Sequence, residues 1–232
     1  MTPEATGDRR PIATRKLRVS QACARALATR HVPANAISVA GMICGAAAGA
    51  CLVATSFAGD GAGGWGVRIL FLAAAGGIQL RLLANMLDGM VAIASGTASA
   101  LGELYNEIPD RVSDTLILAG AGYALGGDPA LGWAAALVAM FVTYIRALGK
   151  GMGVPGLFQG PMSKSHRMFT LTVTCVYLGA APGGWQPMWR PAGRALPVGI
   201  VSAALALIIV GGLVTAGRRL MPIVRACKER GR

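Results

Sequence analysis

The sequence predicts an all-α integral membrane protein of six transmembrane helices, preceded by an amphipathic helix at the membrane interface. Of its 232 residues, 54% are hydrophobic and 14% are charged, a composition that excludes a large water-soluble catalytic domain. Apolar runs of about 20 residues, enough to cross a bilayer core as a helix, recur between residues 36 and 217. The net charge is +12. Because the basic residues cluster beside the apolar runs, this charge favours membrane lipids or a phosphate-bearing partner and not nucleic acid.

Residues 1–34 are expected to form a cytoplasmic arm and the interfacial helix. Between residues 13 and 30, five basic side chains alternate with apolar ones, which is typical of a helix lying among lipid headgroups. A solvated basic arm is the alternative. The first residues lack the apolar core and cleavage site of a signal peptide, so the first span is expected to remain as an anchor.

Six spans are expected to form one domain over residues 35–217, followed by a basic cytoplasmic tail at 218–232. The first covers about 36–58 and carries Gly41, Gly45 and Gly49, a stripe that lets another helix approach closely. The others are expected near 66–93, 100–125, 130–148, 168–183 and 197–217. Basic residues gather in the N-terminal arm, the loop at 149–167 and the tail. Both termini are therefore expected to be cytoplasmic, as in a bacterial-type inner or plasma membrane.

Acidic residues are concentrated in one part of the chain. Five of the ten lie between the end of the second span and the middle of the third: Asp88, Glu103, Glu107, Asp110 and Asp114. A charged side chain at the centre of a bilayer costs about 2.5 to 3.5 kcal/mol on insertion scales. The cluster therefore indicates a polar cavity holding a cation, and a purely structural ion network is the alternative.

The spacing of the polar residues indicates what this cavity binds. Asn85 and Asp88 share one face of the second span, while Asn106, Asp110 and Asp114 step by four along the third. Carboxylate and amide oxygens suit Mg²⁺, Mn²⁺ or Ca²⁺. Small residues on the same faces leave room for a ligand: Gly89, Ala92 and Gly102.

These residues resemble the signature of the CDP-alcohol phosphatidyltransferase family. Every spacing of the family's Asp-x2-Asp-Gly-x2-Ala-Arg-x8-Gly-x3-Asp-x3-Asp is kept in Asn85-x2-Asp88-Gly89-x2-Ala92-Ile93-x8-Gly102-x3-Asn106-x3-Asp110. The segment VPANAIS at 32–38 is also similar to the opening of the family's first helix, Thr-Pro-Asn-x-x-Thr. The resemblance implies a membrane enzyme of phospholipid biosynthesis. Such an enzyme moves a substituted phosphoryl group from CDP-diacylglycerol or another CDP-alcohol to a hydroxyl acceptor and releases CMP. A homodimer is also what the resemblance suggests.

The resemblance further implies a role for each motif position. Asp110 would be the catalytic base. Mg²⁺ or Mn²⁺ would be held by Asn85, Asp88, Asn106 and Asp110. The CDP group would lie against Asp88, Gly89, Ala92 and Gly102.

The sequence departs from the motif at three positions. Asn85 and Asn106 stand where the family has aspartate, and Ile93 stands where it has arginine, so the charge of the four-carboxylate set falls from −4 to −2. Glu103, Glu107 and Asp114 are candidates to restore it, although Glu107 could instead pair with Arg111 at i+4. We expect either a divergent subfamily with altered metal or substrate use, or a catalytically weakened member that binds the CDP-lipid.

Basic residues near the fourth and fifth spans are candidates for binding a phosphorylated or otherwise anionic acceptor: Arg146, Lys150, Lys164 and Arg167. The alternative is that they are ordinary positive-inside loop charges. Arg81, in the middle of the second span, needs a partner that the sequence does not identify. A small ion-coupled transporter is the alternative of another class, but it would more often show acids in two related halves of the chain, and no such halves are present.

Overall fold

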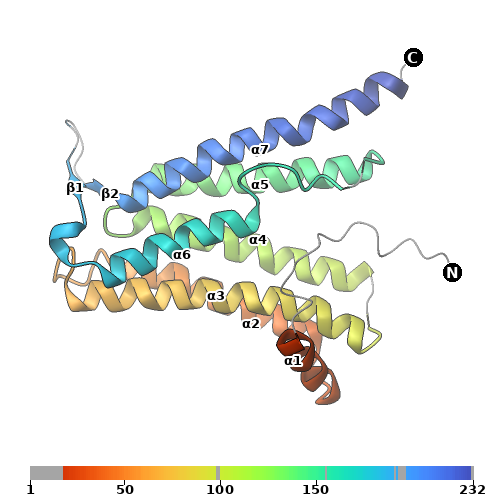
Figure 1. Cartoon of the computed structure of the whole chain (residues 1–232), viewed down its shortest axis with the longest axis horizontal. Helices are drawn as coiled ribbons and strands as arrows, with labels where there is room; N and C mark the ends of the chain where they lie inside the picture. The colour runs from red at the N-terminus through yellow and green to blue at the C-terminus, as the bar shows by residue number, and fades with distance from the viewer. Residues whose placement is uncertain (1–17, 98–99, 155, 191, 193–196, 231–232) are drawn as a thin grey trace.

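The computed structural model describes residues 18–97, 100–154, 156–190, 192 and 197–230, with only the backbone at 100, 101, 103 and 104. In this part of the chain, six long helices lie roughly side by side and a shorter one lies across one end (Figure 1). The helices are α1 (Arg18–Thr29), α2 (Ala34–Ala54), α3 (Trp65–Ala94), α4 (Ala100–Tyr123), α5 (Pro129–Gly151), α6 (Lys164–Ala180) and α7 (Ile200–Arg230). The predicted all-α class is confirmed.

Each of the six long helices overlaps one of the six expected spans. Four of them, α2, α3, α5 and α7, are long and apolar enough to cross a membrane. Helix α4 carries the acidic cluster and α6 has 17 residues. Four spans therefore follow from length and composition, and the other two remain a prediction.

The last helix extends past the predicted end of the sixth span. The sequence predicts a separate tail from residue 218, whereas α7 continues to Arg230. Arg219 donates hydrogen bonds to the backbone oxygens of Gln159 and Val142, and Arg230 donates to that of Met152. These contacts hold the extension against α5 and the loop after it. The composition changes at residue 217, but the helix does not end there. A helix forms its backbone hydrogen bonds internally, so it can continue whether or not lipid surrounds it.

The two ends of the bundle differ. Helix α1 lies beside the C-terminal end of α3, and the last turns of α7 project at the same end (Figure 1). At the opposite end, a 3-10 turn η3 (Gly183–Trp185) precedes two strands, β1 (Met188–Trp189) and β2 (Val198–Gly199). The strands pair antiparallel, with Met188 opposite Gly199 and Trp189 opposite Val198. Strands of two residues are too short to produce a periodic pattern, so the sequence did not indicate them.

The glycine stripe of α2 makes close helix contacts, as predicted. A Cβ atom on Gly41 would lie 2.9 Å from Ala84 Cβ of α3, and one on Gly45 would lie 2.5 Å from Ser113 Cβ of α4. A Cβ atom on Gly49 would lie 2.6 Å from the carbonyl oxygen of Leu116. Helix α2 therefore packs against α3 and α4 at once, at distances that only glycine permits.

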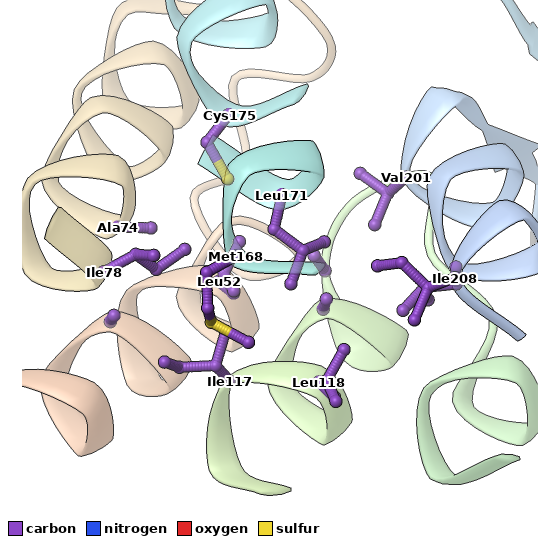
Figure 2. Packing of buried hydrophobic residues seen from close by; sticks show 14 of the residues in the cluster. Leu52, Ala74, Ile78, Ile117, Leu118, Met168, Leu171, Cys175, Val201 and Ile208 are labelled. Atoms are coloured by element: carbon purple, nitrogen blue, oxygen red, sulfur yellow. The ribbon is translucent and has the colours of Figure 1, made fainter. Parts of the chain in front are cut away.

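The apolar core lies where the six long helices meet. Leu52 of α2, Ile78 of α3 and Ile117 of α4 point toward Met168 of α6, and Ile208 of α7 lies beyond Leu118 (Figure 2). These side chains are at most 1% exposed. The close packing of these buried side chains holds the helices in place around the polar site next to the core.

We expect Gly49→Ala to destabilise the bundle by about 1–3 kcal/mol, because the added Cβ would press on the backbone of α4, which cannot move aside alone. The midpoint of thermal unfolding in detergent would report this loss. The matched control is Gly76→Ala on α3, where a Cβ meets nothing within 4 Å. Alanine favours a helix over glycine by about 1 kcal/mol, so the control should melt at or above the wild-type temperature. Equal midpoints for the two variants would contradict the packing described here.

Candidate active site

A polar pocket lies between α2, α3 and α4. The space in the pocket and at its open mouth together is about 180 Å³. Its main polar side chains are Ser38 of α2, Arg81, Asn85 and Asp88 of α3, and Asn106 and Asp110 of α4. Helix α2 brings α3 and α4 together along its glycine stripe, so residues that are distant in sequence converge on this pocket.

Asp88 is held on one side of the pocket. It is 3% exposed. Its Oδ2 accepts a hydrogen bond from Ser38 Oγ at 2.7 Å, and its Oδ1 accepts one from the Gly89 backbone N–H at 2.5 Å. Neither donor is charged, and among the described residues no basic side chain forms an ion pair with Asp88. Its negative charge is thus left for a ligand or a cation.

Asp110 lies opposite and is surrounded by donors. Its Oδ1 accepts from Arg81 Nη2 at 3.1 Å and from the side-chain amide of Asn85, and its Oδ2 accepts from Lys164 Nζ at the start of α6. The Asn85 amide is also 3.4 Å from Asn106 Oδ1. Both carboxylate oxygens of Asp110 are thus held by donors from α3 and α6.

Asp114, one turn deeper in α4, completes a buried ion network. It lies 2.6 Å from Arg81 Nη2 and 3.3 Å from Arg167 Nη2. The side chains of Arg81, Asp114 and Arg167 are all at most 4% exposed. The partners that the sequence leaves open for Arg81 are therefore Asp110 and Asp114, and the network connects α3, α4 and α6.

The structure places the residues expected to bind metal and CDP in two groups. Asn85, Asp88, Asn106 and Asp110 line one pocket. Gly89 lies at its edge, donating to Asp88. Ala92 and Gly102 are nearer the ends of their helices and are not part of the pocket lining.

The residues expected to bind the acceptor are also divided. Lys164 and Arg167 reach Asp110 and Asp114. Arg146 instead lies over the ring of Phe158, 4.7 Å from its centre, and Lys150 is exposed at the end of α5.

The structure places the candidates for restoring charge in different surroundings. Glu107 pairs with Arg111 at 3.0 Å, as the i+4 alternative proposed, and Asp114 forms ion pairs with Arg81 and Arg167. The side chain of Glu103 lies outside the described residues.

Two contributors were not identified from the sequence. Ser38, in the VPANAIS segment, binds Asp88, and Ser113 accepts a hydrogen bond from Arg81 Nε at 2.9 Å. Serine is common in transmembrane helices, so its type alone gives no signal. Ser113 lies one turn beyond Pro109, and its Oγ donates to the Pro109 carbonyl at 2.7 Å.

The oxygen ligands of the pocket fit a divalent ion only in part. Within the described ranges there is no group of three or more His, Cys, Asp or Glu that could hold a metal. Two carboxylates and two amides do supply hard oxygens, and Mg²⁺ often takes one or two carboxylates and completes its shell with substrate phosphates and water. The residues therefore fit a single ion that binds together with a phosphate-bearing ligand.

We expect Asp114→Asn to destabilise the fold by about 3–5 kcal/mol, because it leaves buried guanidinium groups without part of their counter-charge. Thermal unfolding in detergent measures this. Glu107→Gln is the control, since the Glu107 side chain is 55% exposed and exposed i+4 pairs contribute about 0.3–0.5 kcal/mol. If both variants unfolded at the same temperature, the buried network would not be what joins these helices.

The sequence resembles two enzymes of phospholipid biosynthesis. It is 28% identical over 158 residues to the phosphatidylinositol phosphate synthase of Streptomyces avermitilis, covering 66% of this chain and 61% of that enzyme. It is 33% identical over 94 residues to the archaetidylinositol phosphate synthase of Aeropyrum pernix, covering 40% of this chain and 48% of that enzyme. The chain therefore spans less than two thirds of the length of either relative. No family model matches it.

The fold has solved counterparts. The Mycobacterium tuberculosis phosphatidylinositol phosphate synthase with CDP-DAG bound superposes with a TM-score of 0.65 at 18% identity, over 88% of this chain and 93% of that one. The same enzyme in complex with manganese and citrate gives 0.64, over 87% of each chain. At this identity the match establishes a common membrane fold. Together with the sequence similarity to the two synthases, it supports the resemblance to the CDP-alcohol phosphatidyltransferase family that the motif indicates.

Proposed function

We propose that the protein is a membrane transferase that moves a substituted phosphoryl group from a CDP-linked lipid or alcohol to a hydroxyl acceptor and releases CMP. The observation that carries this proposal is the pocket between α2, α3 and α4, where Asn85, Asp88, Asn106 and Asp110 converge at the motif spacing. Homology to two synthases of inositol phosphate lipids supports it. CDP-diacylglycerol is the donor we favour, since the mycobacterial enzyme of the same fold binds CDP-DAG.

In the proposed reaction, the acceptor oxygen forms a bond to the phosphorus that carries the lipid. The bond from that phosphorus to CMP breaks, and CMP leaves with the bonding electrons. Asp110 takes the proton of the acceptor hydroxyl. Before the reaction, Arg81, Asn85 and Lys164 hold its carboxylate in position. Because the pocket is buried, water weakens these contacts little.

Mg²⁺ or Mn²⁺ is the proposed cofactor. Asp88 and Asp110, with the amide oxygens of Asn85 and Asn106, would hold one ion together with phosphate oxygens of the donor. Such an ion, when bound, neutralises charge on the diphosphate and on the departing CMP. The manganese complex of the mycobacterial enzyme supports the choice of metal.

The acceptor is proposed to be a phosphorylated alcohol. Lys164 lies beside Asp110, where an attacking hydroxyl has to arrive, and Arg146 and Lys150 add positive charge along α5. Arg167 is 2% exposed and already bonded to Asp114 and to the Met162 carbonyl. It would therefore support the site and not contact the acceptor directly.

The membrane arrangement completes the proposal. All six long helices would span the bilayer, and α1 would lie at the interface. Since α1 and the C-terminal end of α7 lie at the same end of the bundle (Figure 1), both would be cytoplasmic. Assembly as a homodimer is part of the proposal.

One observation favours a second candidate, a catalytically weakened protein that binds CDP-lipid. Both oxygens of Asp110 already accept hydrogen bonds from positively charged side chains, so neither is free to receive the proton of an acceptor hydroxyl unless a contact opens. Turnover distinguishes this candidate from the first.

The test is CMP release by the purified protein in liposomes with CDP-diacylglycerol, Mg²⁺ or Mn²⁺, and glycerol 3-phosphate, inositol phosphate, serine or glycerol as acceptor. We expect metal-dependent release with one phosphorylated acceptor. Asp110→Asn should reduce the rate by at least about 100-fold, as expected for loss of a general base, and Glu107→Gln should keep it. Binding of CDP-diacylglycerol without release would favour the second candidate. Release that Asp110→Asn leaves unchanged would contradict the assigned base.

We expect the double variant Asn85→Asp, Asn106→Asp to bind Mn²⁺ more tightly than the wild type, because it restores two carboxylates to the pocket. A titration followed by electron paramagnetic resonance of free Mn²⁺ measures this. As a control, the double variant Asn35→Asp, Gln79→Glu adds the same charge outside the pocket lining. An equal gain in both double variants would mean that general charge, and not coordination at positions 85 and 106, is responsible.

A further inference from the structure

Arg81 is the one residue with a positive charge in the described lining of the pocket. Its side chain is 1% exposed. It lies one turn before Asn85 and two turns before Asp88 on α3, so the three share a face of the helix. The guanidinium is thus a fixed part of the pocket wall.

The contacts of Arg81 leave one donor free. Nε donates to Ser113 Oγ, and Nη2 donates to the backbone oxygen and Oδ1 of Asp110 and lies 2.6 Å from Asp114. Nη1 is buried and has no hydrogen-bond partner in the described part of the chain. A buried N–H of a charged group is costly when unpaired. Next to a pocket, such a donor indicates an anionic oxygen of a ligand.

The charges around the pocket lead to the same conclusion. Its described lining carries Asp88 and Asp110 against Arg81, a sum of −1, whereas four aspartates at the motif positions with the same arginine would give −3. With amides at positions 85 and 106, the pocket has too few carboxylates to hold an additional divalent ion. The diphosphate of a CDP-linked donor nevertheless requires positive charge around it.

We propose that Arg81 binds the diphosphate of the CDP-linked donor through Nη1 and supplies positive charge that an additional divalent ion would otherwise supply. This inference rests on the proposed function of the pocket. Guanidinium groups suit the task because they remain charged when buried and present several donors in one plane to phosphate oxygens. The network with Asp110, Asp114 and Ser113 holds the side chain in place before the donor binds.

The test is a calorimetric titration of the purified protein in detergent with CDP-diacylglycerol, once in EDTA and once with Mn²⁺. The wild type should keep measurable affinity in EDTA. Arg81→Gln should weaken binding by about 10- to 100-fold in both conditions, as expected for losing a hydrogen bond between charged groups. Affinity for cytidine, which has no phosphate, should not change. The matched control is Arg68→Gln on the same helix, which removes donors to the Gly179 and Ala180 carbonyls far from the pocket.

Two further variants keep the test valid if Arg81→Gln does not fold. Arg81→Lys retains the charge but loses the planar donors, and should bind with intermediate affinity. The double variant Arg81→Gln, Asp114→Asn removes opposite charges together and should show the same loss as Arg81→Gln. Wild-type affinity in folded Arg81 variants with lowered melting temperatures would overturn the inference and leave Arg81 a structural counter-ion. If the wild type bound no CDP-diacylglycerol in either condition, the proposed function itself would fail.

Discussion

A charge buried among apolar helices has to be matched inside the bundle, and the pairing of Arg81 with Asp110 and Asp114 meets that requirement here. Breaking such a pair leaves an uncompensated charge, at a cost of about 3–5 kcal/mol. The pairing therefore fixes which faces of α3 and α4 meet. Lys164 and Arg167 extend it to α6, so one network aligns the three helices that carry the site.

The network depends on how closely α2 approaches. A Cβ atom on Gly45 would lie 2.5 Å from Ser113 Cβ and 3.5 Å from Arg81 Cγ. Any larger residue there would displace the two side chains that hydrogen-bond to each other beside the pocket. Ser38, two turns earlier on α2, donates to Asp88. The same helix thus makes room for the buried cation and fixes the carboxylate that has no cation of its own.

Helix positions and the convergence of the motif residues could be predicted from the sequence, because apolar runs and i, i+3 or i+4 spacing depend only on helix geometry. The glycine stripe was predictable for the same reason. The partners of Arg81 were not, since they depend on how two helices are rotated about their axes. The end of α7 was also missed: hydropathy changes at residue 217, but Arg219 and Arg230 find backbone carbonyls that support a longer helix. The sequence also did not show which basic residues lie at the site. Lys164 and Arg167 reach it only because the start of α6 lies next to α4.

The amide at position 85 explains how the pocket remains ordered with fewer carboxylates. An aspartate there would face Asp110 and repel it unless a cation lay between them. The Asn85 amide instead donates to Asp110 and lies within reach of Asn106. Two carboxylates at these positions would need a cation between them, whereas the amide and the carboxylate bond directly. Arg81 and Lys164 supply the remaining positive charge from the protein itself. If Arg81 binds the diphosphate as proposed, the asparagine at position 85 and the buried arginine one turn before it act together, and charges fixed to the chain replace charge that a bound ion would otherwise supply.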